Sequence, residues 1–467
     1  MKVIFIKDLQ DYLKSIQFIG LISLTVLLFT TNGLWFRDNC KQQLDLYNKH
    51  TTEVYRNPST VHTTVYRQPA TFLFITEGIE GKSPPGYILS PKGAIRSLPA
   101  GPRNYKLPDI PKPDWTFIVK VVFSLFAILL GYGAISGEKE QGTLRLTLAN
   151  SLRRDRLLAA KYLAIVVTLM IPLLIGMLIS LIITSLHMPQ IFTLDILKKI
   201  PLVLLLSFFY LSFFVLVSLL FSSIIHKSSL VLLTLLTIWI LSVVIIPNTS
   251  GILAEKFSKI PSEFQMAKQV GPMIQQKVWN RINSLWEKFD KGDIKTEEEL
   301  RLQAEDVFEQ GRDEFSKRVE LYENAMKEQL KAVRNISRIS PSALFQYTME
   351  TVSETGPDRD EDFVRDIRAY SAVYDKYILK KQGKLVAAGF FTFGSSRRLE
   401  SGKYIEITTP RPEEFQGDKS DFPRFSESKN SINKNLRLAL LDITFLVLWN
   451  LVLVLMVSAA FNRYDVR

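Results

Sequence analysis

Acidic and basic side chains gather in one short stretch of the sequence, residues 137–161. It opens with a Gly-Glu-X-Glu-X-Gly-Thr pattern made by Gly137, Glu138, Glu140, Gly142 and Thr143. Its six cations are Lys139, Arg145, Arg153, Arg154, Arg156 and Lys161. Leucines lie between them, so the stretch is amphipathic. It cannot cross hydrocarbon, but it can lie at a membrane surface with its arginines among lipid headgroups.

The charged stretch connects two apolar segments, 115–136 and 162–186. Each is long enough to cross the hydrocarbon core as a helix. The charged stretch is therefore predicted to be an elbow on one side of a membrane. Short connections rich in Lys and Arg stay in the cytoplasm, which places the elbow on that side.

The sequence carries no motif for catalysis or nucleotide binding. It has no Gly-X-X-X-X-Gly-Lys-Ser/Thr phosphate loop, no Gly-X-Ser-X-Gly nucleophile turn and no His-Glu-X-X-His zinc pair. We therefore expect no catalytic residue, metal site or cofactor in this chain, and predict that it is not an enzyme. Its one cysteine, Cys40, cannot form an intrachain disulfide or a thiolate metal site. A disulfide between two copies is the less favoured alternative.

The composition indicates membrane segments that alternate with polar domains. The chain has 467 residues, of which 47% are hydrophobic and 22% are charged, and its mean hydropathy is +0.11. This is too apolar for an ordinary soluble protein and too charged for a pure bundle of spans. The net charge of +12 comes from dispersed cations without a nucleic-acid-binding motif, so no nucleic-acid partner is expected.

Six apolar segments are predicted to be transmembrane helices, which makes the fold class a polytopic α-helical membrane protein. They are residues 16–36, 115–136, 162–186, 201–225, 229–246 and 438–461. An amphipathic interfacial helix at 1–15 precedes them and a tail at 462–467 follows, with both termini in the cytoplasm. A cleaved signal peptide is not favoured, because Arg37-Asp-Asn-Cys follows the first segment in place of a small-X-small cleavage site.

Two long polar segments are predicted on the outer side of the membrane. The first, 37–114, contains two runs with the composition of short strands, 61–66 and 71–76. The second, 247–435, is predicted to be a large α+β extracytoplasmic domain, helical in its first half and with short strands between 384 and 409.

One helix start in the larger polar segment can be predicted from its residues. Thr296 is followed three positions later by Glu299, which is the pattern of a capping box. A long helix is therefore expected to begin at Thr296 and to run on through the charged sequence that follows.

The elbow pattern and the Leu-rich turn after it resemble the cytoplasmic elbow of ABC-2 type permeases. In that family the stretch is a coupling helix that lies against an ATP-binding subunit. The resemblance implies coupling roles for Gly137, Glu138, Glu140, Gly142, Thr143, Arg153, Arg154 and Arg156. The two carboxylates would meet basic residues of the ATPase, and the two glycines would permit sharp entry and exit of the backbone. The alternative interpretation is an interfacial helix that only anchors the fold. The three arginines suit headgroup anchoring equally well.

The same resemblance implies the partners of the chain. ATP and Mg would be bound by a separate ABC-type ATP-binding subunit. Two membrane subunits would form a dimer, either as a second copy of this chain or as a paralogue. Membrane lipids are further partners, and an envelope protein is a candidate partner of the outer domain.

Four further motifs resemble one branch of the ABC-2 permeases, the branch that contains the DUF3526 domain. They are Arg338-Ile-Ser-Pro-Ser-Ala-Leu-Phe345, Phe363-Val-Arg-Asp-Ile-Arg-Ala-Tyr370, Asp421-Phe-Pro-Arg-Phe425 and Phe461-Asn-Arg-Tyr-Asp-Val-Arg467. Their order fits the predicted topology. The resemblance implies an exporter-type permease of a bacterial cytoplasmic (inner) membrane, with its large outer domain between spans five and six.

Two ionisable residues lie inside predicted spans, Lys120 in the second and Asp442 in the sixth. They lie at similar depths, and a charge within the membrane needs a partner. We predict that they form an ion pair, with separate snorkelling towards water as the alternative. The aromatic run 208–214 is expected to pack against lipid or a neighbouring helix, with a substrate path as the alternative.

The function expected from these features is that of the permease subunit of an ATP-driven exporter. Its substrate would be amphipathic, such as a lipid, a peptide or a drug-like compound, moved outward or extracted from the membrane. Two alternatives remain open. One is ATPase-coupled force transmission to the outer domain without solute passage. The other is a membrane scaffold or sensor with a ligand-binding outer domain.

Overall fold

The computed structural model describes residues 2–81, 83–92, 94–98, 112–149, 153–187, 194–250, 260, 263–386, 395–400, 403–408, 413–428 and 430–463. Six helices within these ranges are long and apolar enough to cross a membrane. They are Ile16–Arg56, Trp115–Glu140, Arg154–Leu186, Leu194–Ile224, Ser228–Ser250 and Ile432–Asn462. Their number and order agree with the six predicted spans.

The first span is part of a much longer helix. The short helix α1 (Lys2–Leu13) is followed by Ser15, whose hydroxyl accepts a hydrogen bond from the Phe18 amide at the start of α2 (Ile16–Arg56). α2 continues for 41 residues, because no helix breaker occurs before Asn57-Pro58. The apolar side chains end near residue 36, but the helix does not.

α8 (Leu194–Ile224) lies at the centre of the bundle and is the most buried of the six spans. Its neighbours are α4 (Ser124–Gly131), α5 (Gly133–Glu140), α7 (Arg154–His187), α9 (Ser228–Trp239) and α15 (Ile432–Asn462). A helix that is apolar on all sides is expected in such a place. Tyr210 and Phe214 of the aromatic run are buried in this core, which favours packing over a substrate path.

The second and fifth spans each contain a π-helical segment. In the second span, η1 (Ile118–Phe123) lies between α3 (Trp115–Phe117) and α4. In the fifth, η3 (Ile240–Ile245) follows α9. A π-helix shifts the backbone hydrogen bonds by one residue, so some carbonyl groups lose their usual donors.

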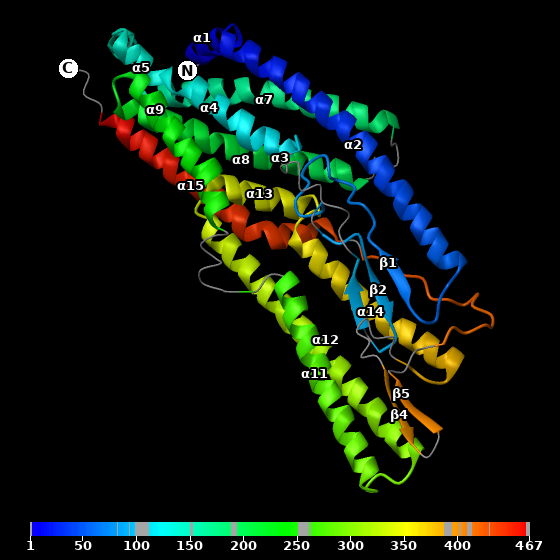
Figure 1. The fold of residues 1–467 in the computed structure, drawn as a ribbon. Helices are drawn as coiled ribbons and strands as arrows, with labels where there is room; N and C mark the ends of the chain where they lie inside the picture. The colour runs from blue at the N-terminus through cyan, green and yellow to red at the C-terminus, as the bar shows by residue number, and fades with distance from the viewer. Residues whose placement is uncertain are drawn as a thin grey trace.

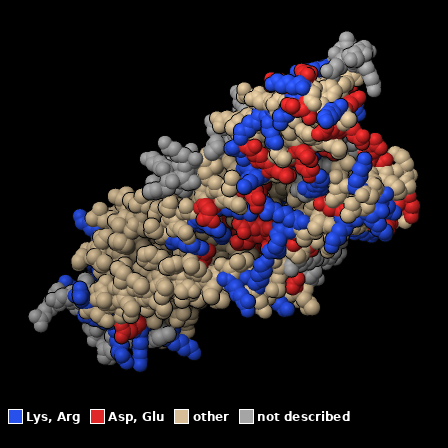
Figure 2. Space-filling model, turned by 90° about the horizontal axis from the view of Figure 1, so that it is seen from below, with Lys and Arg blue, Asp and Glu red and all other residues tan. Residues whose placement is uncertain are grey.

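Both termini and the charged stretch lie at one end of the bundle, which we call the elbow end (Figure 1). The polar region lies at the opposite end and comprises the described parts of residues 57–114 and 251–431. Figure 2 shows a broad surface without charged side chains between charged groups at one end and a mixed-charge surface at the other. Such an uncharged belt is suited to contact lipid, because charges within the membrane are costly.

The polar region contains two small antiparallel sheets. β1 (Thr63–Tyr66), β2 (Gly86–Ser90) and β3 (Ala94–Ser97) form one sheet in that order. β4 (Ser395–Glu400) pairs with β5 (Lys403–Thr408) in the other. These strands confirm the predictions at 61–66 and between 384 and 409, although residues 387–394 of the latter range lie outside the described residues.

The strand predicted at 71–76 is wrong, since this segment forms turns. Its apolar side chains, Phe72 to Ile75, are buried in the core of the bundle. The carbonyls of Phe74 and Ile75 accept hydrogen bonds from the amides of Trp115 (3.2 Å) and Thr116 (2.9 Å) at the start of the second span. The β-branched and aromatic composition therefore reflects burial against helices, not pairing with a strand.

A helical hairpin of α11 (Glu263–Asp290) and α12 (Glu297–Ser337) projects away from the bundle (Figure 1). Its core includes Trp286 and Phe308. The predicted capping box is confirmed at its N-terminal residue, because Thr296 Oγ1 accepts a hydrogen bond of 3.2 Å from the Glu299 amide. α13 (Pro341–Val352) then packs against α8 and α15, and α14 (Pro357–Gln382) follows it.

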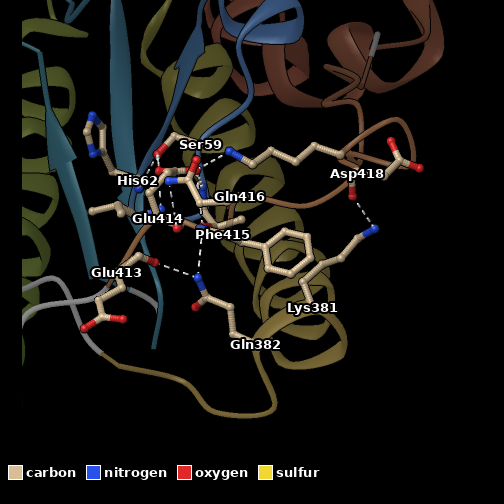
Figure 3. Close-up of polar contacts among 12 residues, drawn as sticks. Ser59, His62, Lys381, Gln382, Glu413, Glu414, Phe415, Gln416 and Asp418 are labelled. Carbon is tan, nitrogen blue, oxygen red and sulfur yellow. Dashed lines mark hydrogen bonds and ion pairs between the residues drawn. The ribbon is translucent and has the colours of Figure 1, made fainter.

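A polar network holds distant parts of the polar region together (Figure 3). The Glu414 carboxylate accepts hydrogen bonds from the Ser59 hydroxyl (2.6 Å) and the Thr60 amide (2.9 Å), and it pairs with Lys419. Gln382, at the end of α14, donates to Thr60 Oγ1 (3.0 Å). Burial alone would raise the pKa of Glu414, but these hydrogen bonds outweigh it and lower the pKa to about 2.

Candidate functional site: the elbow and its contacts

The elbow, residues 137–161, consists of the end of the second span, the short helix α6 (Thr143–Ala149) and the first turns of α7. Between the second span and α6, Gly142 has φ +72°, a left-handed conformation that glycine adopts at little cost. Gly137 does not make the sharp entry expected of it, because it lies within the helical turns of α5. Residues 150–152 of the elbow lie outside the described residues.

Glu138 is engaged within the chain. Its Oε1 lies 2.6 Å from Nζ of Lys161, a lysine of α7 that is only 3% exposed. Asp8 of α1 lies 3.6 Å from the same ammonium group. Burial raises the pKa of the Asp8 carboxyl, and Lys161 offsets part of that rise. One lysine thus joins α1, α5 and α7.

The next two residues stabilise the ends of two other spans. Lys139 Nζ donates to the carbonyl oxygens of Ser222 (3.3 Å) and Ser223 in the last turn of α8. The Glu140 carboxylate accepts hydrogen bonds from the amide (3.0 Å) and hydroxyl (2.9 Å) of Ser228 at the start of α9. A cation at a helix C-terminus and an anion at an N-terminus complement the free backbone groups there.

Arg154 joins the start of α7 to the end of the last span. Its Nη1 donates to the carbonyl oxygens of Phe461 (3.2 Å) and Asn462 (2.8 Å), the final residues of α15. Arg153 and Arg156 are exposed at the same end of the molecule, where lipid headgroups would be in reach. Of the three arginines, Arg154 thus acts as a helix cap.

The elbow therefore contacts α1, α8, α9 and α15 in addition to the two spans that it connects. The two carboxylates expected to meet a partner are both used for these internal contacts. Beside Arg153 and Arg156, the elbow offers one face of α6 at the surface: Leu144 is 1% exposed and packs into the core, whereas Leu146 is 70% exposed. Thr143, at the start of α6, is also exposed.

A second group of contacts joins the polar region to the fifth span. In η3 the amide of Ile246 binds a carbonyl five residues back, and the following residue, Pro247, has no N–H. The carbonyl of Ser242 is therefore left without a donor from its own helix. The hydroxyls of Ser342 (2.8 Å) and Ser340, at the start of α13, donate to it instead.

The second span has a comparable arrangement. The Ser124 amide binds the carbonyls on either side of Lys120, so the Lys120 carbonyl accepts hydrogen bonds from the Ser124 hydroxyl (2.5 Å) and the Tyr210 hydroxyl (2.8 Å). The Lys120 ammonium donates to Gln346 Oε1 of α13 (2.9 Å). α13 thus binds both spans at their π-helical segments.

The predicted ion pair between Lys120 and Asp442 is not formed. Asp442 is 1% exposed and pairs with Arg338, whose Nε lies 2.6 Å from Oδ1. α13 contacts both α15 and η1. Its Gln346 binds Lys120, whereas Arg338, at the end of α12 just before α13, pairs with Asp442. Equal depth in two spans did not make them neighbours.

Four residues that were not predicted to join helices make these contacts. They are Lys139, Lys161, Arg338 and Gln346. The contact at the fifth span could have been predicted from Pro247. This residue removes a backbone donor near the end of an apolar helix, so a carbonyl there needs a hydroxyl or amide donor from elsewhere. The Ser340-Pro-Ser342 motif supplies it.

A bundle of six spans with an amphipathic elbow beside both termini defines a multi-pass membrane protein of the permease type. Residues 2–466 match the family model described as ABC-2 family transporter protein. The chain belongs to this family, which implies that it pairs with an ATP-binding subunit. A comparison with curated proteins gives no match.

Proposed function

We propose that the chain is the permease subunit of an ATP-driven ABC exporter that moves or extracts an amphipathic substrate. The observation that carries the proposal is the elbow, which exposes α6 while it contacts α1 and the ends of α8, α9 and α15. A push on α6 by a partner would reach all of these helices through charged contacts. Direct contact of Glu138 and Glu140 with the partner stays a prediction beside this role.

The orientation follows from the cations of the elbow. Six Lys and Arg residues in a short connection favour the cytoplasmic side, so both termini would be cytoplasmic and the polar region would lie outside a bacterial cytoplasmic membrane. A second permease, identical or paralogous, would complete the translocation path. Membership of the DUF3526-containing branch is part of this proposal, and the inter-helix role of the Ser340-Pro-Ser342 motif supports it.

Affinity capture of the tagged chain from its native membranes tests the coupling role. Leu146→Asp changes the exposed face of α6 and leaves the side chains of Glu138, Lys139, Glu140 and Arg154 unchanged. Leu302→Asp is the matched control, because Leu302 is an exposed leucine of α12 in the polar region. The wild type and the control should both capture an ATP-binding protein. Leu146→Asp should reduce the captured amount about tenfold, which corresponds to a loss of about 1.4 kcal/mol of binding free energy.

Two results would overturn the proposal. One is that the wild-type chain captures no ATP-binding protein from membranes in which its expected partner is expressed. The other is that Leu146→Asp and Leu302→Asp capture it equally, which would leave the elbow as an anchor for the fold.

A second candidate function is force transmission to the polar region without solute passage. It is favoured by α13, which binds the second and fifth spans and also follows the hairpin of α11 and α12. Hydrogen exchange of that hairpin in the complex with its ATPase tests this function. ATP should change exchange in the hairpin, and Ser340→Ala/Ser342→Ala should remove that change. A hairpin that does not respond to ATP would contradict it.

A further inference from the structure

A cavity of about 460 Å³ lies where the bundle meets the polar region. Its walls come from α2, the turns after β1, the start of α8, the start of α14 and the chain before α15. Leu44, Phe72 and Phe363 provide apolar surface. Polar and charged side chains make up the rest of the lining, so the cavity offers both apolar surface and polar groups to a small molecule.

Carboxylates outnumber cations around this cavity. Four acids line it, namely Asp195, Glu354, Asp362 and Glu427, against Lys199 and Arg359. Both cations are already neutralised: Lys199 Nζ lies 2.6 Å from Glu354, and Arg359 lies 3.2 Å from Glu427 and 3.0 Å from Glu80. Neither cation therefore has a charge to spare for an anionic ligand.

Asp195 is the one lining acid without a contact ion pair among the described residues. It is the second residue of α8, one helical turn before Lys199, on which its charge also acts. It is exposed at the cavity, so a ligand can reach it. A carboxylate in that position attracts an ammonium group and repels a phosphate or sulfate.

Ser353, which also lines the cavity, carries a further sign of a ligand site. The Ser353 side chain is fully buried, and its hydroxyl has no hydrogen-bond partner among the described residues. A buried polar group without a partner is costly, so this hydroxyl is poised to bind a polar group that enters the cavity.

We propose that this cavity binds the ammonium group and adjoining alkyl chain of an amphipathic amine, with Asp195 as the counter-ion and Ser353 as a hydrogen-bonding group. This assigns a ligand class to the outer end of the bundle. That the ligand is also transported rests on the proposed exporter function, but its binding does not. The amine can come from an aminophospholipid of the bilayer or from a soluble amphiphile.

Cys40 provides a site-specific reporter, because it is the one cysteine of the chain and lines the cavity. The experiment measures labelling of the full-length chain by two methanethiosulfonate reagents, one with an ammonium group and one with a sulfonate. Each rate is divided by the rate of the same reagent with free 2-mercaptoethanol. The chain is held in phosphatidylglycerol vesicles without an ATPase, so the result is independent of the exporter proposal.

The cationic reagent should react about fivefold faster than the anionic one after this correction, as expected for one nearby charge in a partly hydrated site. Asp195→Lys should reverse the preference, whereas Asp293→Lys, the same change in the turn between α11 and α12, should leave it unchanged. Cys40→Ser should abolish labelling. Because a variant can fail to fold, the wild-type chain is also labelled in the presence of dodecylammonium or dodecyl sulfate, and only dodecylammonium should slow the reaction.

The lipid composition of the vesicles distinguishes the two sources of the amine. Protection of Cys40 by added phosphatidylethanolamine would identify the bilayer as the source, and protection by dodecylammonium alone would identify a soluble amphiphile. Equal normalised rates for the two reagents, or equal protection by dodecyl sulfate, would overturn the proposal. So would a change of preference in Asp293→Lys as large as that in Asp195→Lys.

Discussion

The hydroxyl of Ser342 donates a 2.8 Å hydrogen bond to the carbonyl of Ser242, a hundred residues earlier in the chain. That carbonyl has no donor in its own helix, because the π-helical shift uses the Ile246 amide elsewhere and Pro247 has none. Both serines are buried or nearly so. The contact therefore replaces a lost backbone hydrogen bond inside the bundle, and in doing so it attaches the polar region to the fifth span.

Removal of both hydroxyls with Ser340→Ala/Ser342→Ala should destabilise the protein by about 1–3 kcal/mol, the cost of a buried carbonyl without a partner. Each single variant should cost less, because the other hydroxyl still donates. Thermal unfolding in detergent measures the effect. Ser185→Ala is the control, since the hydroxyl of that half-buried serine donates to the Ile182 carbonyl of its own helix. A double variant no less stable than this control would contradict the role of the two serines.

Arg338→Ala should destabilise the protein strongly, by about 3–5 kcal/mol, because it leaves the carboxylate of Asp442 buried without a partner. Asp442→Asn in the same chain should restore part of the loss, since a neutral amide is easier to bury. The double-mutant cycle is read from thermal unfolding in detergent. Effects of the two changes that simply add would show that the pair does not interact.

Two glycines near the elbow offer a matched comparison. A Cβ atom added at Gly133 or at Gly142 would meet nothing within 4 Å, but only Gly142 has a positive φ, of +72°. Gly142→Ala should therefore cost about 1 kcal/mol, whereas Gly133→Ala, within a helix, should be neutral or should stabilise by up to about 1 kcal/mol. Equal unfolding temperatures for the two variants would contradict this prediction. They would mean that the turn at Gly142 changes its backbone conformation at no cost.

The Glu414 network predicts a dependence of stability on pH. The folded-state pKa of Glu414 is lowered from 4.5 to about 2, so the carboxylate stabilises the fold above pH 4.5 and this contribution is lost as the pH falls towards 2. Glu414→Gln should be less stable than the wild type at pH 7, and the difference should shrink below pH 4.5. Thermal unfolding at a series of pH values measures it. A difference that stays constant from pH 7 to pH 3 would refute the assignment.

The positions of the spans could be predicted because hydrocarbon selects apolar residues, and that selection is visible in one sequence. The ends of the helices could not. α2 continues to Arg56 through polar residues, and α8 begins at Leu194, so that Lys199 is buried in a helix rather than placed in an outer connection. Such boundaries depend on capping groups and on neighbours from elsewhere in the chain.

The elbow could be located from its residues, but the partners towards which its charged side chains point could not be predicted. Glu138 and Glu140 find partners on α7 and α9, which no local pattern reveals. Depth in the membrane suggested that Lys120 would meet Asp442, but depth says nothing of the direction in which a side chain leaves its helix. Arg338 lies in a polar stretch of sequence and gave no sign that it would neutralise a charge inside the sixth span.

The length of α2 has a mechanical consequence. One continuous helix of 41 residues is about 60 Å long at about 1.5 Å per residue. It starts beside α1, which Asp8 and Lys161 join to the elbow, and it ends just before Ser59 and Thr60 of the Glu414 network. As a stiff lever pivoting at its first turns, α2 would convert a tilt of about 10° into a displacement of about 10 Å at its far tip. A small movement at the elbow would then arrive in the polar region as a large one.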